Sequence, residues 1–288
     1  MGTTVSLIIR TYDSVRTLGA SIESIRAQTV PAHVIVVDSG STDGTLHLAQ
    51  RDADEVVQIR HQDFTYGHAL NVGAAAARTP VHGALSSHAV LPRPDWLEIA
   101  LSHIEAGAVA ACGADSDPLH APLTAPVRAD ARYLARHRYW GLTNTADVWD
   151  AAAWRREPFD EALVASEDQE WSWRAVAEGG WIVVDPALLV SGGHRRTAGM
   201  RAYHRRMVSE IRALEHVRPL QQYSVVDAVG DWVRREPRDP FISRARRLGR
   251  TRLLDAAARW DAGRRSAQGS PSTSRFANGR EDERAGTR

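Results

Sequence analysis

Short apolar segments alternate with amphipathic segments along the first hundred residues, and this alternation constrains the fold more than any other feature. The apolar segments are rich in β-branched residues, as buried parallel strands are, and cover Val5–Arg10, His33–Asp38, Glu55–Ile59 and His82–Ser86. The amphipathic segments have helical spacing and cover Ser14–Gln28, Thr45–Arg51, Ala69–Arg78 and Trp96–Ala106. Strands and helices in this order form right-handed βαβ units, so we predict an α/β fold with a mostly parallel sheet flanked by helices.

The pattern becomes mixed after residue 108, and we predict three regions for the whole chain. Further strands are predicted at Ala108–Gly113 and Trp181–Pro186, with a strand-like segment at Leu188–Val190, and helices at Arg128–Tyr139 and Glu167–Glu178. Residues 198–264 have mainly helical patterns. Residues 265–288 are rich in Ser, Gly, Arg and Glu, which is typical of disorder. The sequence therefore predicts an α/β domain over 1–197, a helical region over 198–264 and a disordered tail over 265–288.

Composition excludes several classes of chemistry. All 36 basic residues are arginines, which excludes a Schiff-base lysine and a Walker-type phosphate loop. Cys112 is the single cysteine, so neither a disulfide framework nor a multi-cysteine metal site can form within the chain. No stretch approaches the roughly 20 apolar residues of a spanning helix, and the first residues do not resemble a signal peptide. We expect a cytoplasmic protein, with the inner membrane face as a further option.

Positive charge is concentrated in the second half of the chain. Between residues 194 and 265 there are 18 arginines and 8 acidic residues. Such a block could contact an anionic membrane surface peripherally, or it could merely solvate the outer faces of helices. We find no nucleic-acid-binding motif and expect no nucleic-acid partner. A homodimer is compatible with the sequence.

Polar residues follow three of the predicted strands at the same edge of the sheet. They are Arg10–Asp13, Asp38–Gly40 and Ser86–His88. Ligands of open parallel sheets bind outside the carboxyl ends of the strands, so this edge is the candidate site. Asp38 directly follows four apolar residues, and its carboxylate could accept a hydrogen bond from a base or ribose. A turn or helix cap at Asp38 or Asp43 is the structural alternative.

Five motifs in a fixed order together resemble family 2 inverting glycosyltransferases, which have the GT-A fold. The first is Val5–Tyr12 followed by the VIVVDSGSTDGT segment at 34–45. The second is FTYGHALNVG at 64–73, similar to the family's F-x-H-G-x-x-R-N-x-G segment. Trp96-Leu97, SEDQEWSWR at 166–174 and the segment ending at His194 complete the series. The resemblance covers roughly residues 4–200, and the FTYG segment and late histidine are similar to a rhamnosyltransferase-like branch.

The resemblance implies a nucleotide-sugar site at the predicted sheet edge. The residues that would bind the nucleotide are Thr11, Tyr12, Asp38, Gly67, Asn71, Ser86 and Ser87. His88 and His194 would contact a divalent cation or the diphosphate.

The sequence departs from the family at several of these positions. The usual Asp-x-Asp motif is replaced by Ser86-Ser87-His88, so a metal site depends on imidazole, which suits Mn²⁺ better than Mg²⁺. Gly192 and Leu70 also depart from the family pattern, where His and Arg are frequent. Either change weakens the expected contacts with phosphate.

Glu167 and Asp168 are the candidate catalytic carboxylates. An inverting transfer is a single displacement, in which a base takes the proton of the acceptor hydroxyl. The E-D-x-x-W resemblance assigns that role to Asp168 and places Glu167 and Trp171 on the acceptor side. Alternatively, both acids could simply complement the N-terminal dipole of the predicted helix.

The sequence therefore predicts a glycosyltransferase with a UDP, dTDP or GDP sugar donor and a hydroxyl acceptor on a small molecule, saccharide or lipid-linked compound. A catalytically silent nucleotide-sugar-binding module is the first alternative, because the acidic motif is missing. A nicotinamide-dependent oxidoreductase is a weaker one, since no G-x-G-x-x-G follows the first strand.

Overall fold

The computed structural model describes residues 5–114, 122–137 and 140–192, together with the helical positions 208, 212–214 and 217. The chain divides into two compact units, Met1–His194 and Arg195–Arg288. The predicted helical region and tail lie outside the described residues, except for those five helical positions. His194 also lies outside them.

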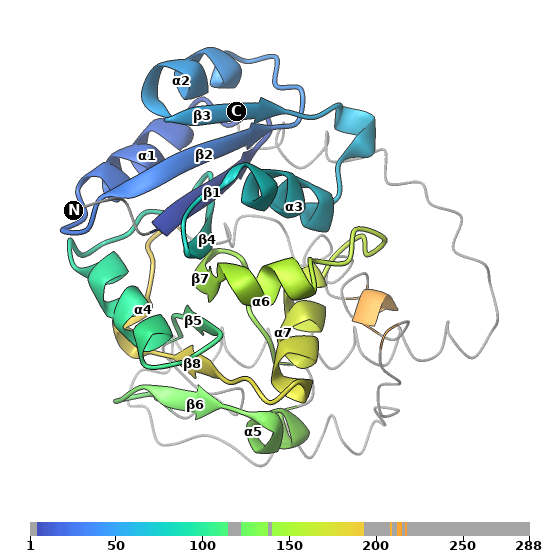
Figure 1. Ribbon diagram of the computed structural model, residues 1–288. Helices are drawn as coiled ribbons and strands as arrows, with labels where there is room; N and C mark the ends of the chain where they lie inside the picture. The colour runs from blue at the N-terminus through green and yellow to red at the C-terminus, as the bar shows by residue number, and fades with distance from the viewer. Residues whose placement is uncertain are drawn as a thin grey trace, which may run out of the picture. The chain divides into compact units, whose positions relative to one another are not determined.

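The first unit is built around one eight-stranded sheet with the order β3-β2-β1-β4-β7-β5-β8-β6 (Figure 1). Its strands are β1 (Val5–Thr11), β2 (Ala32–Asp38), β3 (Glu55–Gln58), β4 (Val81–Ser86), β5 (Ala110–Cys112), β6 (Val127–Ala129), β7 (Ala146–Asp150) and β8 (Ile182–Val184). Strands β1 to β4 are parallel to one another. Strand β7 runs antiparallel between β4 and β5, and β6 runs antiparallel beside β8.

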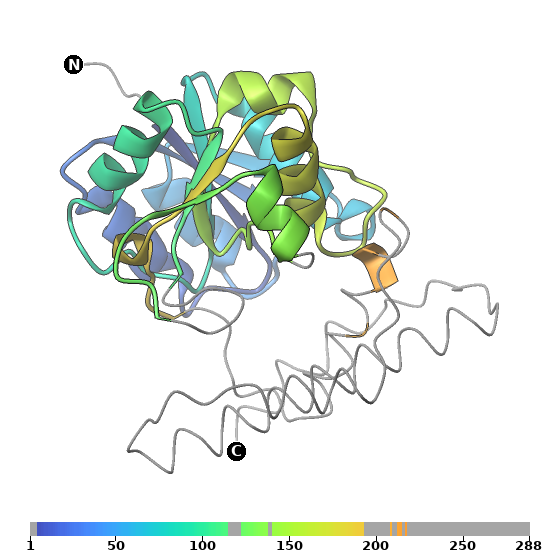
Figure 2. The same cartoon turned by 90° about the horizontal axis from the view of Figure 1, so that it is seen from below.

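Helices cover both faces of the sheet (Figures 1 and 2). They are α1 (Leu18–Arg26), α2 (Thr45–Asp52), α3 (Tyr66–Ala76), α4 (Trp96–Glu105), α5 (Ala131–Arg136), α6 (Ala151–Arg156) and α7 (Glu167–Ala177), with 3₁₀ turns at His61–Asp63 and Pro186–Leu188. The apolar sides of α1 and α4 pack on one face of β1, β2 and β4 and form the main core. Helix α3 packs against β1 and β2 on the other face, where a Cβ on Gly73 would lie only 2.5 Å from the Ile8 side chain.

The predicted α/β architecture is confirmed, and the first four strands and four helices lie close to the predicted ranges. Three details differ. The short strand β7 and helix α6 were not predicted. Strand β6 was not predicted either, and it occupies the start of the helix expected from residue 128. The strand-like segment at 188–190 instead begins within a 3₁₀ turn, Pro186–Leu188, whose first residue is a proline that cannot donate to a strand ladder. Among the described residues, no helix is long and apolar enough to span a bilayer.

His82 is an ionisable residue within the apolar interior. It is fully buried on β4, near the rings of Trp149 and Trp154. Burial lowers the pKa of His82 to about 4, with a further contribution from the positive charge of Arg155. The imidazole is therefore neutral in the folded protein at physiological pH.

The protonation of His82 predicts a loss of stability in acid. Its pKa is lower in the folded than in the unfolded chain, so its contribution is fully present above about pH 6.5 and is lost as pH falls toward 4. The free energy of unfolding should fall by up to about 1.4 kcal/mol per pH unit in this window from His82 alone. Denaturant unfolding of His82→Leu from pH 4 to 7 should show a shallower slope than the parent, whereas His47→Gln on the exposed face of α2 should match it. An identical slope in His82→Leu would contradict this assignment.

Candidate active site

Three parallel strands end together and form the edge at which the candidate site lies. Thr11 of β1 is in register with Asp38 of β2, and Arg10 is in register with Ser86 of β4. Because β7 is antiparallel to β4, the start of β7 reaches the same edge, and the N–H of Ser86 donates to the Thr145 carbonyl. The predicted convergence of these strand ends is therefore present.

Asp38 is fully buried, and its two carboxylate oxygens have different surroundings. Oδ1 accepts hydrogen bonds from the backbone N–H groups of Gly40 and Ser41, each at 3.0 Å. The turn expected as the structural alternative is thus present. Oδ2, however, is buried and has no hydrogen-bond partner among the described residues, and the same is true of Thr11 Oγ1. Buried acceptors that lack partners are costly, so this pair of oxygens indicates a place for a ligand donor.

Aromatic side chains flank this edge. The ring of Tyr12 lies 4.5 Å from that of His61, which is exposed in the 3₁₀ turn after β3. The ring of Phe64 packs edge-on against Tyr66 at 5.2 Å, and Tyr66 is 45% exposed at the start of α3. Exposed aromatic faces beside polar groups suit a base or a sugar ring.

The Ser86-Ser87-His88 segment follows β4 at the predicted position. The Ser86 hydroxyl donates to the Asn144 carbonyl at 3.4 Å, and the Ser87 hydroxyl bonds that of Ser14 at 3.1 Å. His88 is half-buried. Gly192 has a φ of +76°, and a Cβ there would lie 2.4 Å from the His88 carbonyl oxygen. This close approach requires glycine, and it explains why no second histidine stands at residue 192.

The described side chains do not fit a tightly bound divalent cation. Mg²⁺ and Mn²⁺ favour carboxylate oxygens, and the segment after β4 offers only two neutral hydroxyls and one imidazole. Across the described ranges, no group of three His, Cys, Asp or Glu residues is arranged to hold an ion. We therefore assign no chemical step to a metal.

Two residues predicted to bind the nucleotide instead anchor a neighbouring loop. A Cβ on Gly67 would lie 2.7 Å from the Asp160 carbonyl, so glycine is needed for close packing. The Asn71 amide group donates to the Phe159 carbonyl and to Glu161, and its oxygen accepts from the Trp154 indole and the Phe159 N–H, at 2.9–3.1 Å. Asn71 has no capacity left for a ligand, so its position corrects the expectation for this residue.

Glu167 and Asp168 form the first turn of α7 and are both largely buried. Glu167 is 3% exposed, and its Oε1 accepts from the Asn144 amide at 3.1 Å and faces Arg10 Nη1 at 3.5 Å. Asp168 is 9% exposed, and its Oδ1 accepts from the N–H of Gln169 at 2.8 Å. Burial raises the pKa of Asp168 well above its usual range, and the charges of Glu167 and Asp147 raise it further. A carboxylate with a raised pKa is the better proton acceptor.

Asn144 and Asp147, which were not predicted, complete this acidic cluster together with Arg10, which was predicted at the sheet edge. Arg10 Nη2 donates to the Asn144 carbonyl at 3.0 Å, and its guanidinium lies 5.2 Å from the centre of the Tyr66 ring. Asp147 of β7 is fully buried and accepts from the Asn144 N–H at 2.8 Å. The sequence placed Arg10 at the edge but did not predict its pairing with α7. Asp147 could not be predicted, because β7 itself was not predicted.

Backbone strain is concentrated around the same edge. The non-glycine residues with positive φ in the described chain are Asp13, Asn144 and Ser166, at 45°, 47° and 66°. Asp13 lies two residues after β1, Asn144 lies two residues before β7, and Ser166 lies directly before α7. Such conformations cost of order 1–3 kcal/mol each and persist where surrounding contacts enforce them, as is frequent at functional sites.

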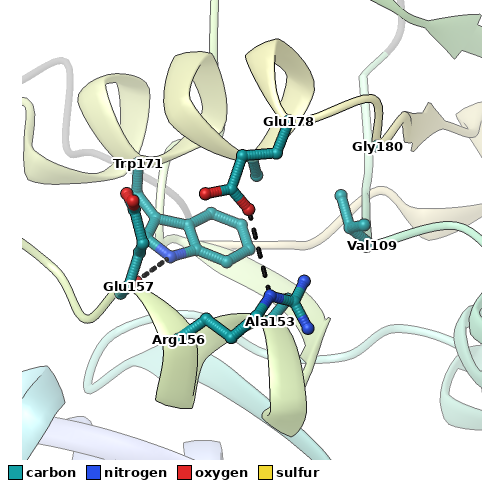
Figure 3. Close-up of a pocket in the computed structure, with 8 residues that line it drawn as sticks. Val109, Ala153, Arg156, Glu157, Trp171, Glu178 and Gly180 are labelled. Carbon is teal, nitrogen blue, oxygen red and sulfur yellow. Dashed lines mark hydrogen bonds and ion pairs between the residues drawn. The ribbon is translucent and has the colours of Figure 1, made fainter.

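Trp171 lies in the interior of the first unit. It is 1% exposed, and its indole N–H donates to the Glu157 carbonyl at 2.8 Å (Figure 3). The pocket that it lines with α6 residues and the Arg156–Glu178 ion pair has a volume of about 40 Å³, which is room for a few water molecules and not for a sugar. The acceptor-side expectation for Trp171 is therefore corrected to a packing role.

Comparison with known proteins identifies the family. The family model described as Glycosyl transferase family 2 matches residues 6–163, which is more than half of the chain. Solved structures with similar folds include the mannosyltransferase PcManGT from Pyrobaculum calidifontis in complex with GDP-Man and Mn²⁺. It is 17% identical, covers 93% of this chain and 76% of its own, and has a TM-score of 0.58.

Two further structures extend the comparison. Residues 1–349 of S. aureus TarS in complex with UDP-GlcNAc are 17% identical, with a TM-score of 0.54 and coverage of 91% of this chain and 92% of that one. A mycobacterial protein is 20% identical, with a TM-score of 0.54 and 74% coverage of both chains. No curated protein sequence matches. At these identities the structures show a common fold, and the sequence match over 6–163 shows that the chain belongs to glycosyltransferase family 2 and has the GT-A fold.

Proposed function

We propose that the protein is an inverting glycosyltransferase that moves a sugar from a nucleoside diphosphate to an acceptor hydroxyl. Family membership excludes the nicotinamide-dependent alternative. The observation that carries the proposal is the buried Glu167–Asp168 pair in the first turn of α7, beside the strand ends that carry Thr11 and Asp38. Arg10 connects the two parts, because it lies next to Thr11 in the chain and pairs with Glu167 in space.

Asp168 is the general base of the proposed reaction. One Glu167 oxygen is engaged by Arg10 and Asn144, whereas Asp168 has only a hydrogen bond from Gln169 among those described. As the acceptor oxygen forms its bond to the anomeric carbon, Asp168 takes the hydroxyl proton and the nucleoside diphosphate leaves. This single displacement inverts the configuration at the anomeric carbon.

The donor is a UDP, dTDP or GDP sugar, held at the edge formed by β1 and β2. Asp38 Oδ2 and Thr11 Oγ1 accept hydrogen bonds from the base or ribose, and Tyr12 with His61 supplies an aromatic face. Solved relatives in this fold contain GDP-Man or UDP-GlcNAc, which supports a nucleotide-sugar donor of this class. His88, two residues after β4, contacts the diphosphate. His194 is expected to do the same from the sequence and lies outside the described residues.

Nucleotide affinity should depend on Asp38 Oδ2. Asp38→Asn retains an oxygen for the Gly40 and Ser41 N–H groups but replaces Oδ2 with an amide donor. Loss of a charge-assisted hydrogen bond costs about 1.5–3 kcal/mol, so affinity for the best of UDP, dTDP and GDP should fall more than about tenfold by calorimetry. Asp43→Asn is the matched control, because both Asp43 oxygens are occupied by Val15 and Thr45. Equal losses in both variants would assign the effect to the loop rather than to Oδ2.

Transfer should depend on Asp168 more than on Glu167. Asp168→Asn keeps the shape of the side chain but cannot accept the acceptor proton, and turnover should fall about 10²–10⁴-fold while donor affinity stays near the parent value. Glu167→Gln should lose less. The measurements are nucleotide affinity and turnover of a nucleotide-sugar panel, including donor hydrolysis. Near-normal turnover in Asp168→Asn would remove it from the mechanism, and binding without turnover in the parent would favour the silent-module alternative.

Divalent cations should contribute little to donor binding, because the segment after β4 has no carboxylate. We expect Mn²⁺ to raise the affinity for nucleoside diphosphates by less than about tenfold over EDTA, and Mg²⁺ to raise it less than Mn²⁺. His88→Ala should remove the Mn²⁺ increment if its imidazole supplies the protein ligand. A hundredfold increase with Mg²⁺ that survives His88→Ala would show that oxygen ligands elsewhere hold the ion.

A further inference from the structure

Asp147 is a buried carboxyl that the proposed reaction does not use. It lies within β7, opposite Ala84 of β4 and Cys112 of β5, and is fully buried. The groups that face it are the Cys112 thiol on β5, Arg10 on β1 and Glu167 and Asp168 on α7. Burial raises the pKa of the Cys112 thiol, and the charge of Asp147 raises it further, so this thiol stays protonated. The charge balance of the cluster therefore rests on three acids and one guanidinium.

Ionising all four of these groups at once would be costly in free energy. The Arg10 side chain is 11% exposed, and the three acids are exposed by 9% or less. The described residues supply one cation for three carboxylates, so full ionisation would leave two of these buried charges without a described counter-charge. Like charges in such a place keep a proton on one of the acids.

Two unpartnered oxygens show where a proton is accommodated. Asp147 Oδ1 and Asn144 Oδ1 are both buried and have no hydrogen-bond partner among the described residues. Asp147 Oδ2 already accepts from the Asn144 N–H. A proton on Oδ1 turns one of these acceptors into a donor and removes one buried negative charge. Glu167 is less suited to hold the proton, because its Oε1 accepts from Asn144 and faces Arg10.

We propose that Asp147 is a positioning residue for Asp168. Asp147 holds a buried proton near neutral pH and thereby sets the pH range in which Asp168 can accept a proton. The inference rests on the proposed function for its consequence, because Asp168 is the base only in that reaction. The proton balance itself is a property of the folded protein alone. Burial raises the pKa of Asp147 to about 7, in accord with this role, and the positive charge of Arg10 opposes the rise. Asp147 and Asp168 interact, so removal of one changes the titration of the other.

Carboxyl NMR of the full chain labelled with ¹³C at aspartate side chains tests this without a substrate. In the parent, at least two aspartate resonances should titrate above pH 6 and should disappear in Asp147→Asn and Asp168→Asn respectively. In Asp147→Asn, the midpoint of the Asp168 resonance should move down by about one pH unit or more, since the negative charge that Asp147 carries once it has lost its own proton no longer opposes ionisation of Asp168. Arg10→Gln should move it up, whereas Arg51→Gln on the surface of α2 should leave it unchanged.

Each other outcome overturns the proposal. If no aspartate carboxyl of the parent titrates above pH 6, the cluster holds no such proton. An Asp168 midpoint that is unchanged in Asp147→Asn shows that the two do not interact. If Asp147→Asn fails to fold, the parent titration and the Arg10→Gln shift still decide the matter. Failure of the proposed function would be seen separately, as transfer by Asp168→Asn with these titrations intact.

Discussion

The antiparallel pairing of β7 with β4 is the constraint on which the site depends. Strands β1, β2 and β4 by themselves would bring Thr11, Asp38 and Ser86 to one edge, as in any parallel sheet. The insertion of β7 next to β4 adds a strand whose beginning lies at that edge, and it supplies Asn144 and Asp147. Asn144 then contacts Arg10, Glu167 and Asp147, so that three separate parts of the chain are fixed against one residue.

The geometry of the strand ends that carry Thr11 and Asp38, where we propose that the nucleotide binds, was predictable because its elements are local. The strand at Val34–Val37 leads directly to Asp38, and both the burial of this carboxylate and its position at the strand end follow from the apolar run before it. Asn71 was assigned to the wrong partner. Its place in a motif was evident from the sequence, but its four hydrogen bonds go to residues more than 80 positions away, and no local pattern encodes such contacts.

The acidic half was predictable only in part. Glu167 and Asp168 could be selected from their segment, whereas the surroundings that change the pKa of Asp168 could not. Strand β7 has only five residues and is followed at once by a helix that Asp150 caps, so neither strand nor helix periodicity develops. Trp171 illustrates the converse error. Aromatic residues near catalytic motifs suggest binding, but position 171 lies on the inward side of α7, where the ring packs against Phe159.

The two halves of the site are joined by Arg10 and by the oxygen atoms that surround its guanidinium. An arginine at the end of a buried strand must have its charge balanced, and here Glu167 and the Asn144 carbonyl do so. That arrangement occupies Glu167 and leaves its neighbour Asp168 without a cationic partner at salt-bridge distance among the described residues. Consecutive residues of one helical turn thereby acquire different chemistry: one carboxylate is held by charge, and the other is left basic by burial. The strained backbone at Asn144 and Ser166 is the local cost of holding both in place, because each lies within two residues of the start of an element that carries an acid of the cluster.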